Sequence, residues 1–300
     1  MYSLSTSWNS ERHRYGFDVV NEIKALGFDS IELGWSLTET MVRDILSMKE
    51  SGVIKISSLH NICPIPKGVD QTRASPDYYS LASDDDAERA LAVAAAKSTI
   101  DYAKRFGARV VVLHTGRVKM RERMRELDSA FSDKEKFVRL REEMIRQREE
   151  LKDGYLDNVI RCLGELVPYA DRSGVALSIE NRFYYGEIPL IPEFAVIFEV
   201  FKRGKLYYWH DAGHAEVFNR LGLASHTEFL DKFSNRLIGI HLHDIIGIMA
   251  DHNPPGLGDF DFTILKPYIN GDTIKVIEAH EPANAEQIRQ SVDYLNRVLG

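Results

Sequence analysis

The sequence ALSIE, at residues 176–180, is a short apolar run that ends on a carboxylate, Glu180. A buried charge is costly unless it is paired or bound to a metal ion, so a strand with this ending needs partners close by. Five other apolar runs of the chain end on a histidine, an aspartate or a glutamate. Their last residues are His60, His114, Asp211, His241 and Glu278.

Strand-like runs rich in Val, Ile, Leu and Tyr alternate with helix-length amphipathic stretches along the whole chain. Eight strands in this order predict an α/β fold, a single (β/α)8 TIM barrel that spans residues 1–300 as one domain. An open, doubly wound parallel sheet is the alternative that the same alternation allows. Expected strands are residues 2–8, 30–34, 54–60, 109–114, 176–180, 206–211, 237–243 and 273–279, and expected helices are residues 17–26, 38–49, 84–106, 191–203, 227–233 and 285–299.

Composition excludes several classes of protein. The 300 residues are 44% hydrophobic and 28% charged, which is typical of a globular domain and excludes low complexity. No apolar run approaches the roughly 20 residues of a membrane span, and the N-terminus lacks a secretory signal. Cys63 and Cys162 are too few for a disulfide framework, so we expect a reduced, cytoplasmic location. The net charge of −7 argues against nucleic-acid binding through a global positive field.

A charged segment departs from a minimal barrel. Arg, Lys and Glu dominate residues 117–153, and we expect a charged helical insertion after the fourth strand, over about residues 117–160. Because the segment follows a strand end, it should lie on the face that holds the other strand-to-helix loops. Its mixed charges and scattered apolar residues favour an exposed helix or helical hairpin with a solvated face. A lid, a partner surface and a phosphate-contacting arm are the alternatives.

The strand ends predict a metal site, because the loops that follow the strands of a barrel converge at one mouth. Imidazole and carboxylate ligands suit a divalent ion such as zinc, manganese, cobalt, iron or magnesium, and no cysteine joins the group. Glu180, Asp211, His241 and Glu278 would make a compact four-ligand site.

Two further histidines, His60 and His114, end neighbouring strands. They could complete a second metal site that shares Glu180, and hydrogen bonding to substrate is the alternative role. Glu32 also ends a strand, and it would contact substrate or form a structural ion pair. Arg182 follows Glu180 by two residues and would bind a phosphate or carboxylate of the substrate, or pair with a neighbouring acid.

Later histidines are assigned by position. His214 follows Asp211 by three residues, and His252 stands beside Asp251; these residues could bind a further ion or hold substrate oxygens. Side chains alternate along a strand, so His210 should face away from Asp211, whereas His241 and His243 should face the same way. The residues alone do not choose between those two. His13, His226 and His280 are assigned to the surface or to positions behind the site.

Several segments together resemble the xylose isomerase-like TIM barrel superfamily, and the resemblance covers nearly the whole chain. This superfamily joins sugar isomerases and epimerases to the endonuclease IV-type apurinic-site endonucleases of AP endonuclease family 2. The resemblance implies that Glu180, Asp211, His241 and Glu278 form the shared metal site, and it selects His241 over His243. The segments that carry it are residues 178–181, 211–214, 241–244, 255–259 and Glu278.

The two branches of the superfamily imply different chemistry. In sugar isomerases and epimerases one divalent ion binds adjacent sugar oxygens, and Glu180 and Glu278 would move protons at carbon. In the endonucleases up to three zinc ions activate water, and this chain matches the extra histidines at positions 60, 114, 214 and 252. It departs from that branch at Ala250, where an Asp is expected, although Asp251 is adjacent. The charged insertion has no counterpart in the endonuclease pattern.

We therefore predict a divalent-metal-dependent sugar or sugar-phosphate isomerase or epimerase, with catalytic Glu180 and Glu278 and a small carbohydrate substrate. An endonuclease IV-like zinc phosphodiesterase and a non-catalytic metal- or ligand-binding barrel are the alternatives. One tightly held ion would support sugar chemistry, and two or three zinc ions would support hydrolysis. Metal-dependent turnover that Glu180→Gln abolishes would exclude the binding barrel.

Overall fold

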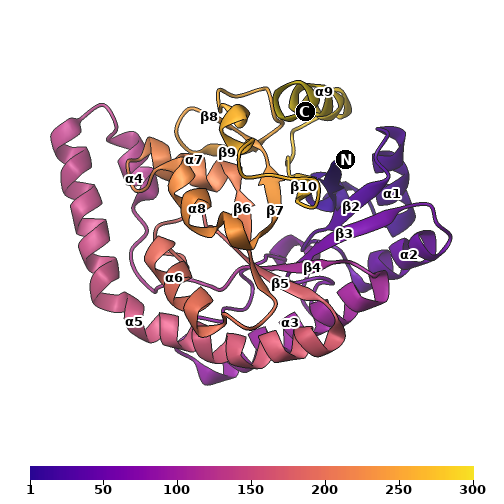
Figure 1. Cartoon of the computed structure of the whole chain (residues 1–300), viewed down its shortest axis with the longest axis horizontal. Coiled ribbons are helices and arrows are strands. Elements are labelled where there is room, and N and C mark those ends of the chain that lie inside the picture. The colour runs from indigo at the N-terminus through magenta and orange to yellow at the C-terminus, as the bar shows by residue number, and fades with distance from the viewer.

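A closed barrel of eight parallel strands forms the centre of the computed structural model, which describes residues 1–300 (Figure 1). Its strands follow one another around the barrel in chain order, and the last pairs with the first. The prediction of a (β/α)8 TIM barrel is confirmed, and an open sheet is excluded. The barrel strands are β1 (Ser3–Ser5), β2 (Ser30–Leu33), β3 (Lys55–His60), β4 (Val110–Leu113), β5 (Ala176–Glu180), β6 (Leu206–Asp211), β7 (Leu237–Leu242) and β10 (Ile274–Ile277).

Helices surround the barrel, and none combines the length and apolarity that a membrane crossing requires. Between β7 and β10 the chain forms an antiparallel hairpin, β8 (Asp244–Ile246) and β9 (Ala250–Asn253), and a short 3-10 helix instead of an α-helix. The helices are α1 (Gly16–Ala25), α2 (Glu39–Glu50), α3 (Asp86–Phe106), α4 (Met124–Ser129), α5 (Lys134–Ser173), α6 (Ile191–Val200), α7 (Ala212–Arg220), α8 (His226–Phe233) and α9 (Ala285–Leu299), with 3-10 helices at Thr6–Trp8, Ser10–Arg12, Gln71–Arg73, Ser234–Arg236 and Phe262–Leu265.

Expected and observed elements agree closely, and the bounds of β5, β6 and α9 are the expected ones. Helix α7 was missed, because it begins directly after β6 without a loop. Its N-cap is Asp211, whose carboxylate accepts a hydrogen bond from the backbone N–H of His214 at 2.7 Å. A carboxylate at the N-terminus of a helix is favoured by the helix dipole. The helix therefore fixes Asp211 at the mouth of the barrel.

The lower part of the barrel interior is apolar. Trp209 points inward from β6 and is fully buried with a small cluster of valine, isoleucine and alanine side chains. Its ring lies against Gly239, where any Cβ atom would collide with the indole, and it meets the ring of His241 edge-on at 5.0 Å between centroids. Because this layer is filled, the acidic and imidazole side chains of the strand ends lie at the mouth above it.

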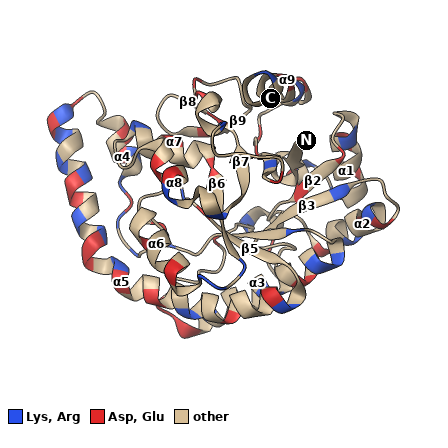
Figure 2. Ribbon diagram, viewed as in Figure 1, with Lys and Arg blue, Asp and Glu red and all other residues tan.

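The charged segment after β4 forms α4 and the first half of α5, so the predicted helical insertion is confirmed. Helix α5 has 40 residues and continues from the insertion into the barrel wall (Figure 1). Acidic and basic residues alternate along its exposed side (Figure 2). Its inner side is packed: Leu140 and Met144 are buried, as are Met124 and Leu127 of α4. The expected solvated face is therefore only the outer side of the insertion.

Candidate metal centre and cavity

Four side chains from four strand ends meet at the mouth of the barrel: Glu180, Asp211, His241 and Glu278. One ligand atom from each lies within 4.8 Å of the others, and no residue of the four is more than 4% exposed. A tetrahedral ion with bonds of about 2.1 Å holds its ligands about 3.4 Å apart. This group, which we call the central cluster, is compact enough to hold one divalent ion after small side-chain shifts.

His241 lies in the middle of the central cluster and uses both ring nitrogens. Its Nδ1 is 2.9 Å from Oε1 of Glu180 and 3.0 Å from Oε2 of Glu278. On its other side, Nε2 is 3.0 Å from Oε1 of Glu32, whose second oxygen accepts a 2.7 Å hydrogen bond from the Ser58 hydroxyl. A carboxylate behind a metal-binding histidine fixes the ring orientation. Glu32 is fully buried and lies in that position, outside the cavity described below.

The carboxylates of the central cluster are held in the ionised form that binds metals. Burial alone would raise the pKa of Glu180, but the imidazoles of His241, His114 and His60 hold it well below its usual range. The pKa of Asp211 is lowered in the same way by His214 and His243. Burial would lower the pKa of His241, but the surrounding acids raise it well above its usual value.

A second donor group lies on the other side of Glu180. His114 Nε2 is 3.0 Å, and His60 Nε2 is 3.3 Å, from Oε2 of Glu180, the oxygen that does not face His241. The two rings meet edge-on at 4.7 Å between centroids. Glu180 thus stands between two sets of donors, and the structure brings His60 and His114 together with it.

A third group contains Asp211, His214, His243 and His252. His243 Nε2 is 2.9 Å and 3.0 Å from the two oxygens of Asp211, and its Nδ1 accepts a hydrogen bond from the backbone N–H of His252. His241 and His243 both point into the barrel, as the alternation predicts. Only His241 lies between the carboxylates of the central cluster, because His243 is turned towards Asp211 from behind.

Asp251 reaches this third group although the neighbouring Ala250 is exposed. One of its carboxylate oxygens is 2.8 Å from Nδ1 of His252 and 3.8 Å from Nε2 of His214. Burial opposes both charges, but each stabilises the other: the pKa of Asp251 falls to about 2 and that of His252 rises to about 9. Asp251 therefore brings a carboxylate to the edge of the third group, next to the position where an Asp was expected.

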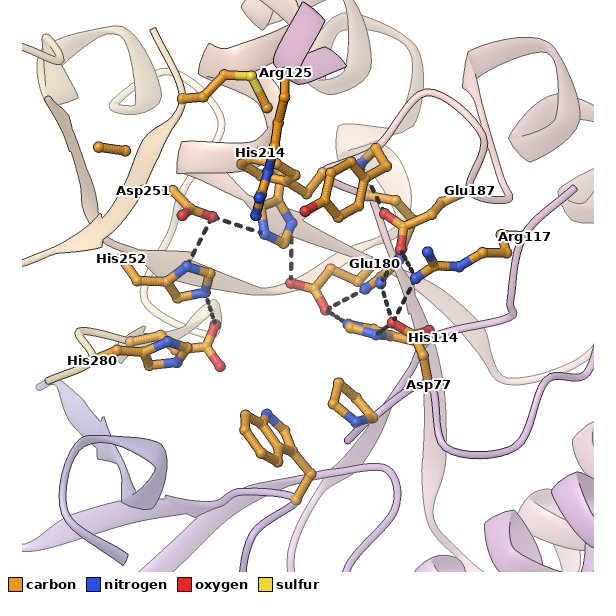
Figure 3. A pocket seen from close by; sticks show the side chains of 18 of the residues that line it. Asp77, His114, Arg117, Arg125, Glu180, Glu187, His214, Asp251, His252 and His280 are labelled. Atoms are coloured by element: carbon orange, nitrogen blue, oxygen red, sulfur yellow. Dashed lines mark hydrogen bonds and ion pairs between the residues drawn. The ribbon is translucent and has the colours of Figure 1, made fainter. Parts of the chain in front are cut away.

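A cavity of about 680 Å³ opens above the three groups (Figure 3). Glu180 and Glu278 line it, whereas Asp211 and His241 lie behind them and do not. Arg125 and two neighbouring residues of α4 line its outer part, so the insertion supplies one wall of the cavity. Two carboxylates of the central cluster are thus open to a ligand, and the other two members are not.

Arg182 lies in the wall of this cavity, buried to 4% exposure. Its Nη2 donates to Asp77 and to Glu187, each at 2.9 Å, so two acids balance its charge. Its Nη1 has no hydrogen-bond partner and is 4.0 Å from Oε2 of Glu180. Nε also lacks a partner, but Nη1 is the nitrogen that lies near Glu180, so its N–H group can donate to a ligand oxygen there.

Sequence reasoning missed several cavity residues, among them Asp77, Glu187 and His280. Asp77 and Glu187 come from loops without periodicity, so no pattern in the chain marked them. His280 was assigned to the surface or behind the site, but it lines the cavity and stacks on His252 at 3.9 Å between centroids. Its position two residues after Glu278 places it on the same side of the chain and could have revealed it.

Comparisons with known proteins agree with this architecture. A family model of the xylose isomerase-like TIM barrel matches residues 20–298. Among curated proteins no sequence matches. Similar crystal structures include a D-tagatose 3-epimerase-like protein (20% identity, 99% of this chain and 96% of that chain covered, TM-score 0.68). They also include 3-keto-D-glucoside 4-epimerase from E. coli (15%, 99% and 98%, 0.69) and a protein from Thermus thermophilus soaked with ZnCl2 (20%, 99% and 96%, 0.59). At these identities the likeness establishes the fold.

Proposed function

Because this chain belongs to the xylose isomerase-like TIM barrel family, we propose that it is a divalent-metal-dependent sugar isomerase or epimerase. The observation that supports this most directly is the position of Glu180 and Glu278. Both belong to the central cluster and both line the cavity, so a sugar that enters it meets two carboxylates beside the metal site.

The residues of the central cluster fit a divalent ion. Three carboxylates and one imidazole form a nitrogen and oxygen donor set that suits zinc, manganese, cobalt or magnesium. Glu32 orients the ring of His241, and the N-terminus of α7 orients Asp211. When bound, the ion would polarise the carbonyl group of a sugar and favour loss of a proton from the adjacent carbon.

The proton transfer itself would use the two exposed carboxylates. Both are ionised, because the imidazole of His241 outweighs the effect of burial and lowers the pKa of Glu180 and of Glu278. One carboxylate would accept the proton from carbon, and the other, once protonated, would return a proton from its own side. The free N–H group of Arg182 would hold a hydroxyl or carbonyl oxygen of the sugar beside Glu180.

The experiment measures exchange of carbon-bound hydrogen for solvent deuterium. The protein is incubated in D2O with a ketose and with manganese, cobalt, zinc or magnesium. The ketoses are D-tagatose, D-allulose and L-ribulose, which are substrates or products of enzymes with similar structures. We expect exchange with at least one ketose in the presence of metal. Glu180→Gln should reduce it by about 10²–10⁴-fold, the usual effect of removing a general base.

Glu165→Gln is the matched control, because Glu165 is an exposed acid that pairs with Lys97 on the outside of the barrel. It should exchange as the unchanged protein does. Absence of exchange with every ketose and every metal would reject the proposal. Exchange that survives in Glu180→Gln would reject the role of Glu180.

A zinc phosphodiesterase remains the second candidate, and one observation favours it. Besides the central cluster, the His60 and His114 group and the third group offer donors for further ions, and Glu180 could bridge the first two sites. Metal analysis of the zinc-loaded protein separates the candidates: one ion per chain supports sugar chemistry, and two or three support hydrolysis. Cleavage of a duplex with an abasic site at low protein concentration would decide for the phosphodiesterase.

A further inference from the structure

A chain of buried polar side chains runs behind the central cluster, on the outer side of β6. It starts at Asn181, passes through Tyr208, His210 and His226, and ends at Glu216 of α7. The first four are at most 3% exposed, and none belongs to the three donor groups. Neither the metal site nor the cavity explains why so many polar groups are buried here.

The orientation of Asn181 is fixed by the backbone of Asp211. Its Nδ2 donates to the Asp211 carbonyl at 2.9 Å, and its Oδ1 accepts from the Asp211 N–H at 2.8 Å. Turning the amide over would place Nδ2 against the N–H of Asp211, two donors, and Oδ1 against its carbonyl oxygen, two acceptors. Oδ1 is therefore the atom that faces Tyr208, and because it can only accept, the Tyr208 hydroxyl donates to it at 2.9 Å.

The remaining directions follow from this one. Since the only hydroxyl hydrogen of Tyr208 points to Asn181, Nδ1 of His210 carries a hydrogen and donates to the Tyr208 oxygen at 2.7 Å. On the other side of the ring, Nε2 of His210 lies 3.2 Å from Nε2 of His226, and one hydrogen bond joins the two nitrogens.

The far end of the chain is ionic. Nδ1 of His226 faces Oε2 of Glu216 at 3.2 Å, and the other oxygen of Glu216 accepts from Arg220 at 2.9 Å. Burial raises the pKa of Glu216, but the hydrogen bonds from His226 and Arg220 outweigh it and keep the pKa below its usual value. His226 thus links Glu216 to His210, and its ring stacks on Phe260 at 4.7 Å between centroids.

We propose that this chain, with its hydrogen bonds pointing from His210 through Tyr208 to Asn181, positions the metal ligand Asp211. Asn181 holds both backbone groups of Asp211, and its own carbonyl faces Nδ1 of His214 at 3.1 Å. Tyr208, His210 and His226 are positioning residues, since they touch neither the ion nor a ligand in the cavity. The hydrogen-bond pattern does not depend on the proposed function. Only the expected effect on metal affinity rests on the proposed metal site.

Reversing the chain shows why its direction matters. If Tyr208 donated to His210 instead, the oxygens of Tyr208 and Asn181 would face each other at 2.9 Å without a hydrogen between them. Asn181 would then be pushed from its place against Asp211. Residues behind the ligands of a metal typically change metal affinity by about 10–100-fold when they are altered.

The test combines histidine NMR with metal affinity. Long-range 1H–15N correlation spectra of the metal-free protein should show His210 with a hydrogen on Nδ1. Zinc affinity, measured by competition with a chromophoric chelator, should fall about tenfold in Tyr208→Phe. Tyr207→Phe is the matched control, because Tyr207 lies next in the same strand on the opposite side and should bind zinc normally.

Each result decides a separate point. An Nδ1 of His210 without a hydrogen in the unchanged protein would overturn the direction of the chain. Equal zinc affinity of Tyr208→Phe and Tyr207→Phe would overturn its positioning role. If the unchanged protein binds no zinc, manganese or cobalt, the proposed function fails and so does the positioning role, while the NMR result still establishes or rejects the direction of the hydrogen bonds.

Discussion

Glu32 shows how a single residue can act on the candidate metal centre without reaching the cavity. Its carboxylate joins Nε2 of His241 to the hydroxyl of Ser58, and none of its surface is exposed. Such a partner keeps the ring turned with its other nitrogen towards the carboxylates, and makes that nitrogen a stronger ligand. The sequence allowed two roles for Glu32, a substrate contact or a structural ion pair. The geometry favours the second role.

Glu32→Gln removes this charge and nearly preserves the shape of the side chain. We expect the affinity for zinc to fall by about 10–100-fold, because the ring of His241 loses its charged partner. Chelator competition measures the change. Glu50→Gln, at an exposed acid without an ion pair, should leave the affinity unchanged. An affinity that does not differ between the two variants would contradict the role of Glu32.

Residues at strand ends were predictable, and residues in loops were not. Glu180, Asp211 and His241 each end an apolar run, so the periodicity of the strand marks both their position and their direction. Asp77 and Glu187 lie in loops, and Arg182 donates a hydrogen bond to each of them. The course of these loops depends on packing against residues that are far away in the sequence. A buried ion pair of this kind leaves no local pattern in the chain.

At the scale of elements, one ion pair fastens the insertion to the barrel. Arg148 of α5 is 1% exposed and donates to both carboxylate oxygens of Glu193 in α6 at 2.8 Å, and to the carbonyl of Glu187 at 2.9 Å. This pair lies where α5 passes from the insertion to the barrel wall. It connects α5 to the loop that carries Glu187 beside the cavity.

Arg148→Met should lower the free energy of unfolding by about 3–5 kcal/mol, because it leaves the charge of Glu193 buried and unpaired. Urea denaturation followed by circular dichroism measures this loss. Arg146→Met is the control on the same helix, since Arg146 is exposed and forms no ion pair, and its effect should lie within about 0.5 kcal/mol. Equal stability of the two variants would show that the pair does not hold the insertion.

The sequence predicted the insertion as helical, but not how it joins the barrel. Its charges indicated solvent exposure on the outer side, which the structure has, whereas the few apolar residues between them gave no sign of what they pack against. Leu140 and Met144 are buried, and α4 packs against α5, the helix that carries them. That contact depends on the turn between the two helices, which the charge pattern does not specify.

At the scale of the whole molecule, the barrel closes where the two ends of the chain meet. Strand β1 pairs with β10, and Nε1 of Trp8 donates to the carbonyl of Ala283 at 2.8 Å. Arg12 pairs with Glu22 of α1 at 2.8 Å and with Glu281 at 3.2 Å. Residues almost the whole length of the chain apart thus form one junction, so its stability reports on closure of the barrel.

Acid should weaken this junction through Glu22. Burial would raise its pKa, but the hydrogen bonds from Arg12, Asn9 and His13 lower it from 4.5 to about 2. A lowered pKa stabilises the folded state above the ordinary value and loses that effect as pH falls through the folded value. The melting temperature of the unchanged protein should exceed that of Glu22→Gln at pH 6, and the difference should shrink between about pH 4.5 and 2.

Glu11→Gln serves as the control for this series, because Glu11 is an exposed acid in the same segment without an ion pair. Its melting temperature should follow that of the unchanged protein at every pH. A difference between the unchanged protein and Glu22→Gln that stays constant from pH 6 to pH 2 would contradict the pairing. Scanning calorimetry at four or five pH values is sufficient.

The alternation of side chains along β7 affects how the strands of the barrel find their native register. His241 and His243 face the interior and Leu242 faces the helices, while Asp211 and Val276 are the neighbours of His241 on the adjoining strands. A slip of one residue would turn Leu242 inward and both imidazoles outward. A divalent ion would therefore stabilise only the barrel with the native strand register. Folding in the presence of the ion would favour this register over registers shifted by one residue.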